Sequence, residues 1–392
     1  FSGIKTQVRI FMSFSSDSDH DIDRVIEETL LLGFLNKDYE CSALIRHRFP
    51  SKVGGFPAWL NPQYLPTPDQ LQCGQCSHVM QFICQIYAPL DISHCTFHRT
   101  LFVFCCTRGC SHSTHSVKVF RSQLPRDNPY YSPTPLPDGD YRSDHTNNAE
   151  SVMIDEPYDQ VHLCDVCGVA APKRCSQCHN RFYCSKAHQL LDWRSVHSST
   201  CGTDDIRPNC QYALPQFEVV IEEADLSSPS LTDKEKDLID KYENEVRHLN
   251  ESDRADHNEL ESFQNGAEID GVFVEFQSLM SGAPDQCIRY QRAPDARPLW
   301  VHGGDQLPGA MIGKITCPTC KGPADFEFQI MPQLLSYLAV DAEFDFGTIV
   351  VHTCRRSCGS GLDRYMEENV WRQSPPAPMQ SSSLPVNNVS PT

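Results

Sequence analysis

The spacing of cysteines and histidines is the feature that most constrains this chain. The 392 residues include 20 cysteines. Two ligands only two or three residues apart can hold one metal ion from a single turn, so repeated close pairs indicate metal binding rather than redox chemistry. Between residues 164 and 201, four such pairs follow one another: Cys164 and Cys167, Cys175 and Cys178, Cys184 and His188, His197 and Cys201.

Four pairs are enough for two tetrahedral zinc sites, each with three cysteines and one histidine. A thiolate cluster needs a cation, and such a site keeps about one net negative charge. Complete protein ligation leaves no coordination position for a substrate water, so we expect structural rather than hydrolytic sites. The alternative, a set of reduced cysteines scattered through a core, does not account for this regular spacing.

This block resembles a MYND finger. The resemblance lies in Phe182-Tyr183-Cys184-Ser185 and in the close Gln189-x3-Trp193-x3-His197-x3-Cys201. It implies interleaved ligation, with one zinc on Cys164, Cys167, Cys184 and His188 and the other on Cys175, Cys178, His197 and Cys201. Many such fingers have cysteine where His188 stands, and a neutral histidine is an acceptable donor there. We expect Leu190 and Trp193 to pack under the zincs rather than to recognise a partner, because a small finger needs its apolar side chains.

The flanks of the finger contain a concealed repeat. Trp59, Leu65-Pro66, Phe82, Gln85 and Val119-Phe120-Arg121 recur in order as Trp300, Leu307-Pro308, Phe326, Gln329 and Val370-Trp371-Arg372. Each half also carries a C-x2-C and a C-x3-C pair: Cys73, Cys76, Cys106 and Cys110 in the first, Cys317, Cys320, Cys354 and Cys358 in the second. We predict a further zinc in each half, against the alternative of buried reduced thiols. Cys105 competes with Cys106, but only Cys106 matches its counterpart in spacing.

These patterns predict an α+β, β-rich fold in which two related cysteine-containing β halves flank an inserted zinc finger. Whether the halves form two domains or one intertwined body is left open by the sequence. We expect a helix over Ile22–Leu35, strands over Val79–Tyr87, Thr100–Cys106, Ser116–Arg121 and Phe217–Glu222, and a helix within 232–249. The predicted organisation is a variable N-terminal segment (1–40), first half (41–125), linker (126–160), finger (161–201), acidic segment (217–270), second half (271–373) and disordered tail (374–392).

Net charge and the length of apolar runs disfavour several classes of function. The formal net charge is −18, which disfavours phosphate-backbone binding and anionic membranes. The longest apolar run, Leu30–Leu35, is far shorter than the ~20 residues of a membrane span. The start does not read as a signal peptide, so we expect an intracellular protein. Residues 217–270 hold 17 acidic and 5 basic side chains, a net of −12.

Beyond the finger, the chain from about Gly33 to Gln373 resembles the programmed cell death protein 2 family. The matching motifs are listed in order: Phe49-Pro50-Ser51-Lys52-Val53-Gly54-Gly55-x2-Ala58-Trp59-Leu60, Gln85-Ile86-Tyr87-Ala88-Pro89-Leu90, Phe104-Cys105-Cys106, Phe120-Arg121-x-Gln123-Leu124-Pro125, Phe217-Glu218-x-Val220-Ile221-Glu222 and Phe328-Gln329-Ile330-Met331-Pro332-Gln333-Leu334-Leu335.

The resemblance implies a non-enzymatic zinc-binding protein of cytoplasm and nucleus that acts as a dedicated chaperone for a new, basic small-subunit ribosomal protein. The acidic segment could shield such a client, although a solvated linker accounts for it equally well. The alternative is a transcriptional or apoptotic adaptor. The basic finger suits an acidic or proline-rich peptide, or the chain's own acidic segment. We find no nucleotide-binding, hydrolase or methyltransferase motif and expect no enzyme activity and no sequence-specific nucleic-acid binding.

Overall fold

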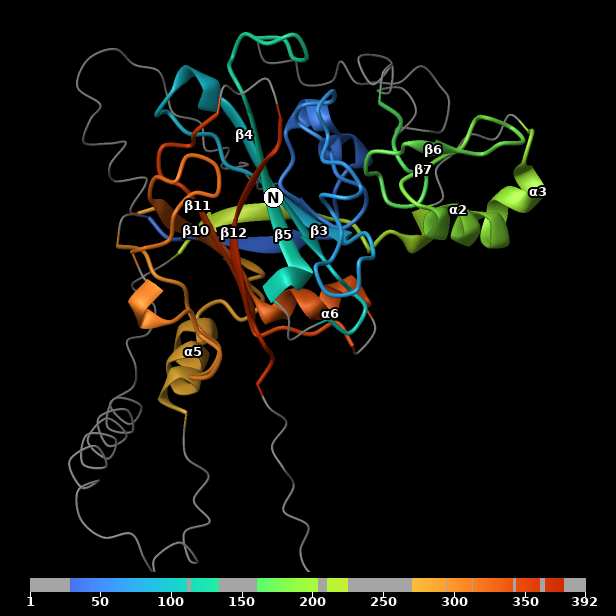
Figure 1. Ribbon diagram of the computed structural model, residues 1–392. Helices are drawn as coiled ribbons and strands as arrows, with labels where there is room; N and C mark the ends of the chain where they lie inside the picture. Colours follow the sequence, from blue (N-terminus) through green and yellow to red (C-terminus); the bar gives the residue numbers. More distant parts are fainter. Residues whose placement is uncertain are drawn as a thin grey trace, which may run out of the picture.

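Ten strands close into one barrel, and the finger lies beside it (Figure 1). The computed structural model describes residues 29–110, 114–133, 161–203, 210–224, 270–293, 295–311, 313–340, 343–359 and 364–376. The barrel strands are β1 (Leu31–Asn36), β2 (Lys52–Val53), β3 (Gln81–Tyr87), β4 (His98–Cys105), β5 (Val117–Leu124), β8 (Phe217–Glu223), β9 (Ile288–Tyr290), β10 (Ala324–Ile330), β11 (Thr348–Cys354) and β12 (Met366–Gln373). The helix within 232–249, most of the linker and most of the tail lie outside the described residues.

The order of the strands shows how the two halves of the repeat are joined. Around the barrel it runs β1-β8-β2-β3-β4-β5-β12-β11-β10-β9, and neighbouring strands are antiparallel. The first half therefore contributes β2 to β5, and the second contributes β9 to β12 in mirrored order. The halves meet directly where β5 pairs with β12, and β1 and β8 complete the opposite side. The two halves thus form one intertwined body, and the β-rich prediction is confirmed.

The halves also share local irregularities and one core. A break in register falls between Phe82 and Cys84 on β3 and at the equivalent place between Phe326 and Phe328 on β10. Such bulges bend a strand and raise its twist, which helps a sheet close. Alternate residues of β4, such as Leu101 and Cys105, face the barrel interior, which is filled by apolar side chains from both halves.

Strand β1 corrects the expected helix over Ile22–Leu35 at residues 31–35, while its residues 22–28 lie outside the described part of the chain. Residues 31–36 pair with β8 along their whole length and with β9 over three residues. Gly33 lies at the closest approach, since a Cβ there would stand 2.8 Å from Cβ of Ile288. The apolar run Leu30–Leu32 suits a helix or a buried strand equally well, and pairing with two distant strands decides between them. Part of the segment expected to be variable therefore belongs to the barrel.

The finger packs on the first half through a shared apolar cluster. It contains β6 (Lys173–Arg174), β7 (Phe182–Tyr183), α2 (Lys186–Asp192), a π-helical turn (Trp193–His197) and α3 (Ser198–Thr200). Trp59 is fully buried and donates its indole N–H to the carbonyl oxygen of Gly168, at 2.8 Å. Outward residues of β4, Phe102 and Phe104, stack near this indole, so the finger rests on the outer face of the barrel.

Within the described ranges, the α-helices outside the finger are α5 (Gly271–Ser281) and α6 (Leu335–Leu338). Helix α5 follows the acidic segment, begins at an Asp270 cap and packs Phe276 and Met280 against Leu299 and Met331. Helix α6 lies near the lower rim in Figure 1. Within the described part of the chain, no helix combines the length and apolarity that a bilayer crossing requires.

Candidate metal centres

Among the residues that the structure describes, four groups of side chains have the arrangement of a metal site. Within each group, the potential ligand atoms all lie within 4.8 Å of one another. The groups have the memberships predicted from the sequence: Cys73, Cys76, Cys106 and Cys110; Cys164, Cys167, Cys184 and His188; Cys175, Cys178, His197 and Cys201; Cys317, Cys320, Cys354 and Cys358. All sixteen predicted residues are therefore brought together, including those of the two flanking groups.

The four C-x2-C pairs lie on four separate turns, or knuckles, that share one backbone conformation. The residue after the second cysteine has a positive φ in all four pairs, at 58° for Ser77, 70° for Gly168, 61° for His179 and 60° for Lys321. Its N–H donates to the carbonyl oxygen of the first cysteine at 2.9, 2.8, 3.2 and 3.0 Å respectively. Left-handed backbone costs roughly 1–2 kcal/mol at a residue with a side chain. Three non-glycine residues adopt it here, so the flanking knuckles share the shape of the finger knuckles in spite of that cost.

The distances between ligand atoms match tetrahedral zinc. A Zn–S bond of about 2.3 Å places the sulfurs of a tetrahedron about 3.8 Å apart. Each flanking group joins a C-x2-C pair to a C-x3-C pair. Between these pairs, the sulfurs of Cys76 and Cys106 are 3.5 Å apart, those of Cys320 and Cys354 are 3.6 Å apart, and those of Cys317 and Cys358 are 3.6 Å apart. A disulfide requires about 2.05 Å, so these cysteines are not joined as disulfides.

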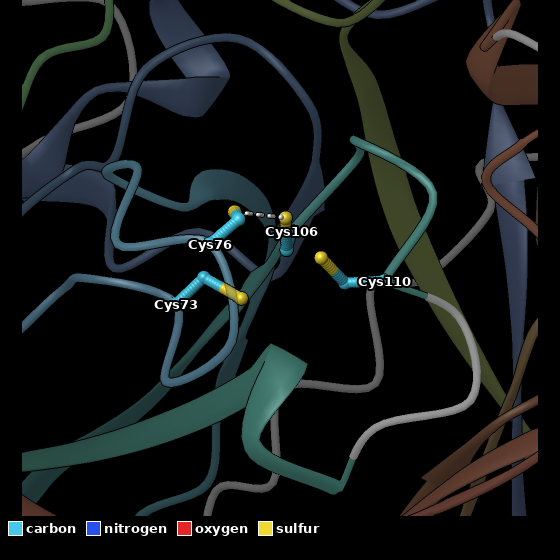
Figure 2. Close-up of side chains that lie close together, drawn as sticks. All are labelled: Cys73, Cys76, Cys106 and Cys110. Atoms are coloured by element: carbon cyan, nitrogen blue, oxygen red, sulfur yellow. Dashed lines mark hydrogen bonds between the residues drawn. The ribbon is translucent and has the colours of Figure 1, made fainter.

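Figure 2 shows how the first-half group is assembled from two loops. Cys73 and Cys76 lie on the knuckle before β3, Cys106 and Cys110 lie on the turn after β4, and the four sulfurs face a common centre. Cys105 points the other way, into the barrel core. The spacing argument that favoured Cys106 over Cys105 is therefore supported by the geometry.

Two elements of the finger place its histidines. Ser185 caps helix α2, and its hydroxyl accepts from the N–H of His188 at 3.2 Å, which leaves the imidazole beside Cys184 with 3.1 Å between Nδ1 and Sγ. His197 ends the π-helical turn, with its Nε2 at 3.5 Å from Sγ of Cys178. A π-turn widens the helix at a functional position. The two histidines thus face their cysteines with different ring nitrogens.

Burial and neighbouring groups shift the pKa values of the cysteine thiols in different directions. Burial raises the pKa of Cys105 and of Cys287 to about 12, so these core thiols are neutral. At Cys320, a hydrogen bond from the backbone of Gly322 lowers the pKa to about 7, which favours a thiolate. Burial and then the neighbouring thiols raise the pKa of Cys358 in the same group. One group therefore cannot ionise all its thiols unless a cation neutralises them, and this donor set fits zinc.

The finger surface differs from the sequence-based expectation. Leu190 and Trp193 were expected to pack beneath the zincs, but they are 42% and 37% exposed. Tyr183 fills the interior instead, and its hydroxyl donates to the buried carboxylate of Asp192 at 2.7 Å. The packing prediction holds only in part: the indole of Trp193 meets the ring of His197 edge-on, at 5.5 Å between centroids, but both side chains stay partly exposed.

The sequence reading missed the residues that surround the flanking groups. The carboxylate of Glu368 on β12 accepts from the N–H of Cys354 at 3.1 Å. Arg121 on β5 donates to the carbonyl oxygen of Cys358 at 2.9 Å. Arg121 stood in a repeated motif, but nothing in a motif indicates that its partner lies in the opposite half. These contacts could be found only once the strand order was known.

Comparison with known families agrees with this architecture. The N-terminal domain of Programmed cell death protein 2 matches residues 29–138, its C-terminal putative domain matches 270–374, and a MYND finger matches 164–201. The chain is 41% identical to Programmed cell death protein 2 of Bos taurus, over 83% of this chain and 91% of that protein. This chain belongs to the Programmed cell death protein 2 family.

Other relatives extend the comparison. Programmed cell death protein 2 of Rattus norvegicus is 36% identical over 89% of this chain and 97% of its own length. A Schizosaccharomyces pombe protein named Probable 20S rRNA accumulation protein 4 is 32% identical over 33% of this chain and 34% of its own length. No solved structure gives a significant match.

Proposed function

We propose that this chain is a dedicated chaperone that keeps a new, basic small-subunit ribosomal protein soluble until assembly, in cytoplasm and nucleus, by binding and without catalysis. The observation that carries the proposal is the acidic run that begins on the barrel. Glu222 and Glu223 are exposed at the end of β8, and residues 217–270 carry a net charge of −12. A strongly basic client is attracted to such a surface and is kept from nonspecific anionic contacts.

A relative and the metal chemistry support this proposal. The name of the Schizosaccharomyces pombe relative links that protein to rRNA accumulation. We propose two zinc ions in the finger and one in each flanking group, each ion held by four protein side chains. Ions with complete protein ligation rigidify a fold and offer no open position to a substrate. Rigid, non-catalytic support for a charged surface is what a client-binding protein requires.

Affinity purification from growing cells tests the function. The tagged chain is purified after nuclease treatment, beside a variant in which residues 225–269 are replaced by a Gly/Ser linker of equal length. This replacement leaves β8 and the Asp270 cap of α5 in place. We expect one free small-subunit ribosomal protein with the intact chain and its loss with the variant. Deletion of 377–392 is the control and should retain the client.

Two outcomes would change the proposal. Retention of the ribosomal protein by the linker variant would keep the function and move the contact to the barrel or the finger. Absence of any free ribosomal protein from both preparations would overturn the chaperone assignment. Fractionation of the same cells, with the client followed in cytoplasmic and nuclear extracts, tests the two compartments.

A peptide-binding adaptor is the second candidate, and the finger surface favours it. Leu190 and Trp193 are exposed three residues apart on one helical face. Lys173, Arg174, Lys186 and Arg194 are also exposed, whereas Arg181 is buried beside Asp165 at 3.5 Å. An apolar site with basic surroundings suits a proline-rich or acidic peptide. Corepressor subunits that co-purify with the chain and are lost in Trp193→Ala would favour this function.

A further inference from the structure

The two halves meet along a short ladder between β5 and β12. Strand β5 pairs with β4 over eight residues but with β12 over only three, from Val119–Arg121 to Glu368–Met366. Beyond Glu368, β12 changes partner and pairs with β11. We call this three-residue ladder the seam. So few backbone hydrogen bonds need support from elsewhere to hold two halves of a barrel together.

That support comes from the turn that carries two cysteines of the second-half group. Turn 354–359 contains Cys354 and Cys358, and it lies against β5 of the opposite half. Gln123 donates to the carbonyl oxygens of Ser357 and Gly359 at 3.1 and 3.2 Å and accepts from the hydroxyl of Ser357 at 2.9 Å. Arg121 adds its bond to the carbonyl oxygen of Cys358 at 2.9 Å. Strand β5 of the first half is thus hydrogen-bonded directly to this turn.

The side chains that join β5 to turn 354–359 are buried and charged or polar, so their hydrogen bonds are costly to break. Arg121, Gln123, Ser357 and Glu368 are each 4% exposed or less. The guanidinium of Arg121 also pairs with the carboxylate of Glu368 at 2.6 Å, within the seam itself. When a buried charged network loses one partner, the polar groups bonded to that partner gain no replacement hydrogen bond, because water does not reach them. If the turn moves, these side chains lose several partners at once.

A metal ion in the second-half group would hold the turn in that position. Ser357 has a positive φ of 45°, a backbone conformation that a residue with a side chain adopts at a cost. Cys354 begins the turn and Cys358 follows Ser357 directly, and their sulfurs lie 3.6 Å from those of Cys320 and Cys317 respectively. A tetrahedral ion would tie both cysteines of the turn to the knuckle before β10.

The second half also contacts the first-half cysteine group, but through fewer hydrogen bonds. Arg372 on β12 donates to the hydroxyl of Ser116 at 2.8 Å, and the carbonyl oxygen of Ser116 accepts from the N–H of Cys106 at 2.8 Å. The second half thus reaches the first-half group through one intervening residue. The direct contacts from β5 to turn 354–359 are more numerous, so the second-half ion has the greater hold on the seam.

We propose that the second-half cysteine group is a zinc-dependent clasp that keeps the barrel closed at the seam. It rests on the proposed zinc in that group, and it does not depend on the client. With zinc bound, turn 354–359 is fixed and Arg121 and Gln123 hold it. Without zinc, the turn relaxes and the seam opens. Loss of ligands in the second half would therefore expose strand β5 of the first half.

Hydrogen exchange on the full chain tests the clasp. Cys320→Ser removes a ligand on the knuckle, away from the turn that β5 contacts. We expect one zinc fewer per chain by elemental analysis and at least tenfold faster amide exchange at residues 119–124. Cys178→Ser is the matched control, because it also removes one ligand but belongs to a finger group, with Cys175, His197 and Cys201. It should lose one zinc and leave exchange at 119–124 within twofold.

A second variant separates the clasp from general loss of folding. Gln123→Leu keeps every cysteine and removes the bonds to Ser357 and Gly359. We expect full zinc content with faster exchange at residues 366–368. Zinc loss in Cys320→Ser without faster exchange at 119–124 would overturn the clasp and leave the metal site intact. Unchanged zinc content in Cys320→Ser would remove the second-half ion and the clasp together, while client co-purification would still report on the chaperone function independently.

Discussion

Gln85 on β3 and Gln329 on β10 make the same contact in the two halves of the barrel. The side-chain oxygen of Gln85 accepts from the N–H of Ala58 at 2.8 Å, and that of Gln329 accepts from the N–H of Leu299 at 2.7 Å. The amide nitrogen of each glutamine donates back to the carbonyl of the same residue, at 3.4 and 2.7 Å. Each glutamine therefore binds a backbone strap that crosses the outside of the barrel one residue before a tryptophan.

Gln329→Leu should destabilise the fold by about 3 kcal/mol, because it leaves the buried N–H and C=O of Leu299 without partners. Gln329 is 1% exposed, so water cannot replace the amide. Urea unfolding followed by tryptophan fluorescence measures the change. Gln277→Leu, at an exposed position on α5, is the control and should shift stability by less than about 0.5 kcal/mol. Equal effects of the two substitutions would contradict this role for Gln329.

Trp59→Phe should loosen the finger without unfolding the barrel. Phenylalanine keeps an aromatic ring near Phe102 and Phe104 but cannot donate to the carbonyl oxygen of Gly168. We expect a loss of about 1 kcal/mol from the missing hydrogen bond, and about 3–5 kcal/mol for Trp59→Ala, which also leaves a cavity. Limited proteolysis at the finger boundary reports on docking, and zinc content serves as the control. Protease resistance equal to the unmodified chain would mean that the finger is anchored elsewhere.

Cys167→Ala should release the zinc ion of its own group and destabilise the finger without unfolding it, because metal binding supplies much of the folding free energy of such small modules. We expect four zinc ions in the intact chain and three in this variant, measured by elemental analysis. Cys95→Ser is the control, since Cys95 belongs to none of the four groups, and it should keep all four ions. Two ions in the intact chain would restrict zinc to the finger.

The metal groups could be predicted because ligand spacing is a local property. A C-x2-C pair closes its own knuckle, and the recurrence of the pattern supplied the second pair in each half. Strand order could not be predicted, because it depends on contacts between residues far apart. Arg99 on β4 and Glu327 on β10 form a fully buried pair at 2.5 Å across 228 positions of sequence. In the repeat, Ile83 stands at the position of Glu327, so this pair has no trace in the repeated motifs.

The two errors have related causes. The apolar run Leu30–Leu32 suits a helix as well as a strand, and pairing of β1 with β8 and β9 overrides local preference. Trp193 was assigned to packing by its residue type, and it does contact the His197 ring, but Tyr183 rather than Trp193 fills the buried interior. Both outcomes depend on what occupies neighbouring space, which residue patterns do not specify.

Acidification should destabilise the barrel through His98. Burial lowers the pKa of His98 from 6.5 to about 4; its ring stacks on Phe49 with 4.1 Å between centroids, and Nδ1 lies 3.0 Å from the hydroxyl of Tyr87. Between those pH values the unfolded chain binds a proton that the folded chain does not. Stability therefore falls as pH drops from about 6.5 towards 4, and at pH 5 the loss from this group is about 2 kcal/mol.

The measurement is urea unfolding at pH 7 and pH 5 for the intact chain and for His98→Gln. Glutamine can still bond to Tyr87 but cannot take up a proton, so its stability should fall less between the two pH values, by about 2 kcal/mol. His94→Gln controls for loss of an exposed histidine. Identical pH dependence in the intact chain and His98→Gln would show that His98 is not the group that titrates. The comparison is made above pH 4.5, where protonation of the carboxylates contributes least.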